Sequence, residues 1–142
     1  MTVKPWAEFT SDLPDDVIET EDGSGFIQYG GKSVAAAIGE ILTRLGGVVS
    51  PPIYADEHGW ELDAVFGKRR LWGQITLIEG WLFVFQDPAF LPKLLGRPHP
   101  IYLDVLTRLA DELARDSRFH NVRWYSSNQV LSGLPGDKTP VS

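Results

Sequence analysis

The stretch that most constrains the fold is residues 59–87, GWELDAVFGKRRLWGQITLIEGWLFVFQD. In residues 60–66, apolar and acidic side chains alternate, with the period of a strand that has one buried face. Residues 71–78 are rich in β-branched side chains, which favour strands. Residues 81–85 are apolar throughout, and this predicts a central strand covered on both faces.

Two short polar connections separate these three runs. Gly67 and Lys68 open a basic turn after the first run. Glu79 and Gly80 connect the second run to the third, and a glycine in second place suits a hairpin turn that needs a positive φ. The stretch therefore predicts three antiparallel strands joined as a meander.

Helical periodicity flanks the meander. Apolar side chains recur at three- and four-residue spacing over residues 34–45, between the N-cap candidate Ser33 and a Gly46-Gly47 pair that ends a helix well. A second apolar stripe predicts a helix over residues 101–115. A last strand follows over residues 119–124.

The order of these elements predicts an α+β fold: a single small domain with an antiparallel sheet built on the meander and two main helices packed largely on one face. We expect the domain to span residues 25–126, after a loosely ordered acidic N-terminal arm, residues 1–24. Residues 127–142 are expected to form a loosely held tail. Residues 48–54 contain two prolines and are expected to form a sheet-edge segment or a loop. Residues 89–95 are expected to form a short helix, or only a turn because of Pro92.

Charge is concentrated at the N-terminus. Residues 1–30 hold seven acids and one base, for a net charge of −6, whereas residues 31–142 hold twelve of each. A solvated arm is one interpretation. An arm that steers a basic partner is the other, and its candidate partner-binding residues are Asp12, Asp15, Asp16, Glu19, Glu21 and Asp22.

Composition argues against several classes of partner and chemistry. The chain has no surplus of lysine and arginine for phosphate contacts, so nucleic-acid binding is not expected. No apolar run approaches the roughly 18 residues of a membrane span. The chain has no cysteine and begins without a secretory signal pattern, which is compatible with a cytoplasmic protein.

The segment Gly30-Gly31-Lys32-Ser33 invites comparison with a phosphate-binding loop. That loop requires a glycine at position 26, which is Phe26 here, and no buried strand is predicted before it. A plain helix start is the favoured interpretation. A weaker alternative is an anion resting on the helix N-terminus beside Lys32.

No catalytic, metal-binding or cofactor-binding residues are predicted. The histidines at positions 58, 99 and 120 are far apart and lack the spacing of metal ligands. Glu61 and Asp63 share one face of the first meander strand, where a solvated sheet face explains them as well as acid–base chemistry would. We therefore expect a non-catalytic protein without a cofactor.

A second set of candidate partner-binding residues lies on the second meander strand. Trp72 is opposite in phase to the apolar Leu71, so it lies either under a second layer or on an exposed face. With Arg70 and Gln74 beside it, Trp72 forms a candidate interface anchor. The basic turn Lys68-Arg69-Arg70 could instead pair with the acidic arm or with an acidic patch on a partner.

Three features together resemble small acidic immunity proteins of bacterial toxin systems. They are the helix over 34–45 with its two glycines, the G-W…L-W-G pattern at 59–73, and the pattern L-x-x-x-x-R-F-x-x-V-R-W at 113–124. The resemblance covers about residues 34–126 and implies a protein-binding module that neutralises a basic partner protein. The alternatives are a ligand-binding or enzymatic domain with a pocket between helix and sheet, and a protein similar to type III secretion chaperones.

Overall fold

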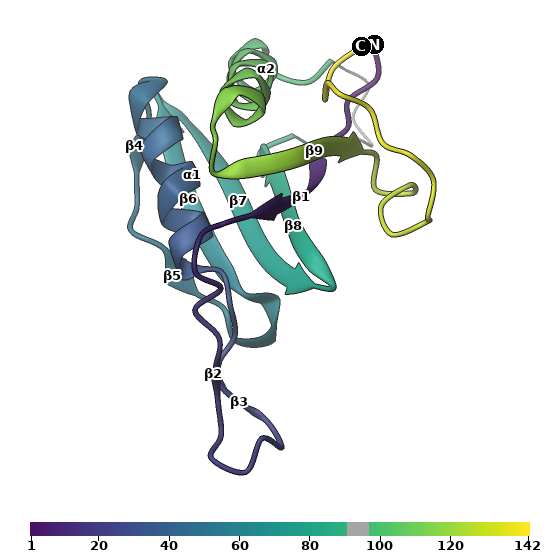
Figure 1. The fold of residues 1–142 in the computed structure, drawn as a ribbon. Helices are drawn as coiled ribbons and strands as arrows, with labels where there is room; N and C mark the ends of the chain where they lie inside the picture. Colours follow the sequence, from purple (N-terminus) through teal and green to yellow (C-terminus); the bar gives the residue numbers. More distant parts are fainter. Residues whose placement is uncertain (91–96) are drawn as a thin grey trace.

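The computed structural model describes residues 1–90 and 97–142. Its centre is an antiparallel sheet with the strand order β4-β6-β7-β8-β1-β9, and β5 pairs with β6 beside β4 (Figure 1). In the described residues, two α-helices and one short 3₁₀ helix, η1 (Asp56–His58), accompany the sheet, so the predicted α+β class is confirmed. The strands of the sheet are β1 (Trp6–Ser11), β4 (Val48–Val49), β5 (Ile53–Tyr54), β6 (Trp60–Phe66), β7 (Arg69–Ile78), β8 (Gly80–Gln86) and β9 (Phe119–Tyr125).

The predicted meander is present as β6, β7 and β8, with β8 inside the sheet between β7 and β1. The first turn contains Gly67 at φ 65. In the second turn the positive φ belongs to Glu79, at 59, so the prediction that Gly80 takes this conformation is wrong. Ile78 and Gly80 pair with each other, which leaves Glu79 as the residue that reverses the chain.

The N-terminal strand β1 is an inner strand of the sheet. Ala7 lies opposite Phe83 on β8 and Trp124 on β9, and both Ala7 and Phe9 are buried. The prediction that residues 1–24 form a loosely ordered arm is therefore wrong for residues 6–11. The physical reason is the alternation of Ala7 and Phe9 with polar neighbours, which gives this short segment one apolar face for the core.

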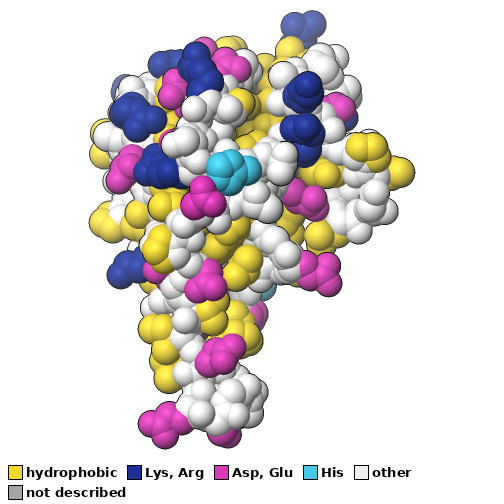
Figure 2. Space-filling model, in the orientation of Figure 1, with side chains coloured by type: hydrophobic (Ala, Val, Ile, Leu, Met, Phe, Trp, Pro, Cys, Tyr) yellow, Lys and Arg dark blue, Asp and Glu magenta, His cyan; other side chains and the backbone are white. Residues whose placement is uncertain are grey.

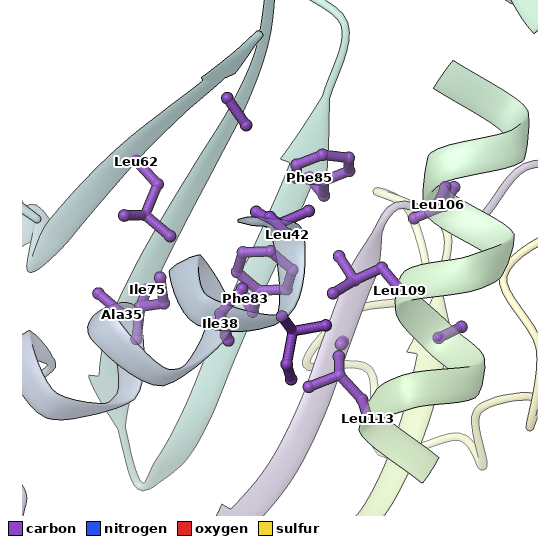
Figure 3. Packing of buried hydrophobic residues seen from close by; sticks show 14 of the residues in the cluster. Ala35, Ile38, Leu42, Leu62, Ile75, Phe83, Phe85, Leu106, Leu109 and Leu113 are labelled. Atoms are coloured by element: carbon purple, nitrogen blue, oxygen red, sulfur yellow. The ribbon is translucent and has the colours of Figure 1, made fainter. Parts of the chain in front are cut away.

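Both helices pack on the same face of the sheet, as predicted. Helix α1 (Lys32–Arg44) and helix α2 (Pro100–Arg115) direct Leu42 and Leu109 toward Phe83 and Phe85, so the core lies between the helices and the sheet (Figure 3). Neither helix has the length and apolar character needed to cross a membrane, and no other helix of the described residues does. The short helix predicted over 89–95 lies mostly outside the described residues.

Helix α1 begins in a different way from the prediction. Its N-cap is Gly31, with φ 128, and Ser33 is already inside the helix. The carboxylate of Asp16 accepts a hydrogen bond from the Ser33 backbone N–H at 2.6 Å and a second from the Ser33 hydroxyl at 3.1 Å. A carboxylate at this position satisfies a free N–H group and complements the positive end of the helix dipole.

The C-terminal segment returns to the sheet. Asp137 and Trp124 exchange two backbone hydrogen bonds, at 2.7 and 2.9 Å. Thr2 and Ser142 exchange two more, at 3.0 and 3.1 Å, so the termini lie side by side (Figure 1). The prediction of a loosely held tail over 127–142 is wrong for residues 137–142, because backbone pairing holds them against the chain.

Candidate functional site

A small hairpin projects from the body of the molecule. It consists of β2 (Ile18–Glu19) and β3 (Phe26–Gln28), which pair antiparallel outside the main sheet (Figure 1). In the space-filling view, acidic side chains gather at this projecting end, while most basic side chains on the visible face lie at the opposite end (Figure 2). The hairpin therefore concentrates negative charge away from the core.

Hydrogen bonds within the turn hold the hairpin tip. The Asp22 carboxylate accepts from the hydroxyls of Ser24 and Thr20, at 2.7 and 2.8 Å, and from the Ser24 backbone N–H at 3.0 Å. These donors, with the Ser24 hydroxyl the largest contributor, lower the pKa of Asp22 to about 2. The Asp22 side chain therefore stays ionised at any physiological pH and keeps a fixed orientation at the tip.

Apolar side chains lie exposed beside these acids. Phe26 and Ile27 on β3 are 50% and 63% exposed, and Tyr54 on β5 is 38% exposed. The Phe26 ring lies 4.8 Å from that of Tyr29, whose backbone N–H donates to the Tyr54 hydroxyl at 2.9 Å. We call residues 18–27 together with Ile53 and Tyr54 the hairpin surface.

The base of the hairpin is joined to the body. The side-chain amide of Gln28 donates to the Asp16 carbonyl at 2.7 Å, and the Gly31 N–H donates to the Asp15 carbonyl at 3.0 Å. The Trp60 indole N–H donates to the Tyr29 carbonyl at 3.0 Å. These contacts connect the hairpin to the start of α1 and to β6, so its position is defined relative to the sheet.

The six predicted acidic residues divide into two groups. Asp12, Asp15 and Asp16 contact the body or their own loop: Asp12 lies 2.7 Å from His120, Asp15 accepts from the Val17 N–H, and Asp16 caps α1. Glu19, Glu21 and Asp22 belong to the hairpin surface and are exposed. Only the second group stands free of the body as a charge cluster that a partner could meet.

The start of α1, which the sequence offered as an alternative anion-binding site, is occupied by a side chain of the protein itself. The Asp16 carboxylate occupies the position beside Lys32 where an anion would rest, because it accepts from the Ser33 N–H. Lys32 itself lies over the Trp60 ring, with its Nζ 5.7 Å from the ring centroid. This arrangement favours the plain helix start over the weaker alternative of a bound anion.

The residues predicted on β7 share the sheet face that points away from the helices. Arg70, Trp72 and Gln74 alternate with the buried Leu71 and Gly73, so sequence phase places them correctly. Trp72 is half-buried, and its position on this face answers the question that sequence phase left open.

The acids of β6 engage two of these side chains. The indole N–H of Trp72 donates to Glu61 at 3.0 Å. The Arg70 guanidinium contacts Asp63 at 2.6 Å. Cross-strand pairing is thus the structural role of the acid pair Glu61 and Asp63.

The basic turn does not pair with the acidic N-terminal residues. Arg69 contacts the buried Asp87 at 2.6 Å, and Arg70 contacts Asp63. Among the described residues, the ion pairs of these two arginines are made with acids of β6 and of the end of β8. Lys68 is exposed in the turn.

The two predicted partner-binding sets come near each other through the end of β7. A small hollow of about 150 Å³ lies between the hairpin base and Thr76 and Leu77, with Val17 and Phe26 on its other wall. Trp72 precedes Thr76 by four residues on the same strand, a separation of about 13 Å. The hairpin surface is thus separate from, but close to, the sheet face that carries Arg70, Trp72 and Gln74, which we call the Trp72 face.

Among the described residues, no group of three or more histidine, aspartate or glutamate side chains is arranged to hold a metal ion. An open groove of about 590 Å³ lies between α1 and the β4 edge, lined by Gly39, Thr43, Val49, Pro51 and Leu62 among others. This groove is shallow and carries no constellation of catalytic side chains in its described lining.

Searches with the sequence and the structure found no matching family model, no matching curated protein and no matching solved structure.

Sequence reasoning missed the apolar half of the hairpin surface. Phe26 and Ile27 form a short apolar run in the sequence, and such a run is compatible with a strand. Their exposure depends on the hairpin leaving the body, and no local pattern signals that. Ile53 and Tyr54 join the surface only because β5 pairs with Glu61 and Trp60 of β6.

Proposed function

We propose that this chain is a non-catalytic protein-binding module of the immunity type, which neutralises a basic partner protein through the hairpin surface. The observation that carries the proposal is the projecting hairpin, which combines the exposed acids Glu19, Glu21 and Asp22 with the exposed apolar Phe26 and Ile27. A cytoplasmic location belongs to the same proposal.

The two kinds of side chain have different roles in the proposed encounter. Charges act over the Debye length of about 8 Å at physiological ionic strength, so a projecting acidic cluster attracts a basic surface before contact. Apolar and aromatic side chains that become buried in the complex then limit dissociation. Phe26 and Tyr54 are the proposed anchors, since both are exposed and ordered by neighbouring aromatic rings.

The Trp72 face is the second contact in this proposal. Trp72 keeps its hydrogen bond to Glu61 and Arg70 its ion pair with Asp63, so both side chains are already oriented before a partner arrives. Such preorganisation reduces the entropy lost on binding. A partner that covers the hairpin and extends about 13 Å along β7 reaches both sets.

A chaperone-like function has less support. That alternative requires an apolar helix face for pairing between two copies. The outward face of α2 is charged instead, with Asp104, Arg108, Asp111 and Arg115 exposed.

The proposal is tested by capture with matched variants as bait. The hairpin variant carries Glu19→Gln, Glu21→Gln and Asp22→Asn. The control variant carries Asp104→Asn, Asp111→Asn and Glu112→Gln, which removes the same charge from α2. Mass spectrometry should identify a basic protein that wild type and the control retain and the hairpin variant loses. Equal capture by all three baits would contradict the proposal.

A further inference from the structure

A second candidate site lies on the sheet face that points away from the helices. A half-open cavity of about 300 Å³ lies there between β1, β8, β9, the β7–β8 turn and one residue of the C-terminal segment, Leu131. Small-molecule sites in proteins begin at about this volume. The cavity shares no residue with the hairpin surface, so a ligand bound in it would not depend on the protein partner proposed above.

Three charged side chains line this cavity: Glu8, Arg123 and, exposed at the β7–β8 turn, Glu79. Glu8 on β1 and Arg123 on β9 lie directly opposite each other in the strand register. Opposite charges in this position generally pair. Within the described parts of the chain, however, no ion pair joins them, and the Arg123 guanidinium donates to the Val122 carbonyl at 2.8 Å. Between the strands the cavity therefore offers the Glu8 carboxylate and the Arg123 guanidinium, which do not neutralise each other by contact, and the exposed Glu79 adds a second carboxylate at the turn.

The rest of the lining is mostly aromatic and aliphatic, with the polar side chains of Thr10 and Asn121. Leu82 is buried in the floor, and Ile78 and Leu131 lie at the sides. The Tyr125 phenol also lines the cavity, where burial and the charge of Glu8 raise its pKa. The phenol therefore remains protonated at neutral pH, and its hydroxyl lies close enough to the Glu8 carboxylate to donate a hydrogen bond to it.

We propose that this cavity binds a small zwitterion, namely an α-amino acid with an aliphatic side chain. Its ammonium group lies at Glu8, its carboxylate lies at Arg123, and its side chain packs against Leu82 and Leu131. A lone cation would leave the Arg123 charge without a partner, and a lone anion would face Glu8. A zwitterion meets both of these cross-strand charges at once, while Glu79 stays exposed to solvent.

The experiment is a titration of the ¹⁵N-labelled full chain with L-leucine, followed by two-dimensional NMR. Saturable shifts are expected at Glu8, Leu82 and Arg123. N-acetyl-L-leucinamide keeps the shape and removes both charges, 3-methylbutylamine keeps only the ammonium group, and 4-methylpentanoate keeps only the carboxylate. Each of these should bind at least about tenfold more weakly, as expected for the loss of a charge-assisted contact.

Variants provide a second test of the same assignment. Glu8→Gln and Arg123→Gln should each weaken L-leucine binding by about tenfold or more, whereas Asp111→Asn on the exposed face of α2 should leave it unchanged. The absence of saturable shifts at about 10 mM L-leucine would overturn the proposal. Equal binding of any single-charge or uncharged probe would also overturn it, and that comparison needs only the wild-type chain.

Discussion

Replacing Asp16 with alanine should destabilise the fold, although sequence reasoning placed this residue in a loose arm. The Asp16 carboxylate caps α1 through the Ser33 N–H at 2.6 Å and the Ser33 hydroxyl at 3.1 Å. The backbone of Asp16 also has a positive φ of 64. Aspartate tolerates this conformation better than alanine does.

The expected magnitude is the sum of two effects. Loss of a helix cap with its charge costs about 1–2 kcal/mol in the free energy of unfolding. Holding alanine at a left-handed φ costs about 1 kcal/mol more. A chain of this length loses about 3 °C in melting temperature for each kcal/mol. The variant should therefore melt about 6–9 °C below wild type.

Thermal unfolding followed by circular dichroism measures this change. Asp16→Asn should lose less than Asp16→Ala, since asparagine keeps an acceptor oxygen and tolerates the positive φ. Glu19→Gln is the matched control: it removes one exposed charge and should shift the melting temperature by no more than about 2 °C. If Asp16→Ala melts together with Glu19→Gln, the proposed cap does not stabilise α1 and the reasoning is refuted.

Three further predictions concern the sheet and its pH dependence. Deletion of residues 1–24 removes the inner strand β1 and should abolish cooperative unfolding, so a sharp melting transition in the truncated chain would contradict the placement of β1. Phe83→Ala should cost about 3–5 kcal/mol in urea unfolding, because Phe83 is fully buried; a loss near zero would contradict that burial. Burial, and then the charge of Asp87, raise the pKa of Tyr102 above its ordinary value of 10.0. The stability that Tyr102 contributes is complete below pH 10.0 and declines as the pH rises further, so Tyr102→Phe should flatten the alkaline loss measured by urea unfolding between about pH 9 and 11.

The meander and both helices could be predicted from sequence because each has a strong local period. The alternation in residues 60–66 and the apolar stripe in residues 34–45 depend only on neighbouring residues. β1 was missed although Ala7 and Phe9 alternate with polar residues, because its six residues precede a long acidic segment. Its position between β8 and β9 depends on pairing with strands more than seventy residues away, which no local pattern encodes.

The candidate site was predictable in part for the same reason. Strand alternation places Arg70, Trp72 and Gln74 on one face, and the structure agrees. Composition identified the acidic residues but could not separate Asp16, which caps a helix, from Glu19, which is exposed. That separation depends on tertiary hydrogen bonds, and these appear only when the chain is folded.

The association rate of the hairpin variant with the captured partner is the most direct test of the central claim. Surface-plasmon measurements at about 50 and 150 mM salt vary the Debye length across the range in which a projecting charge cluster acts. The variant with Glu19→Gln, Glu21→Gln and Asp22→Asn should associate more slowly than wild type and with a weaker salt dependence, while the α2 control variant should match wild type. If the hairpin variant associates at the wild-type rate with the same salt dependence, the acidic hairpin does not recognise the partner.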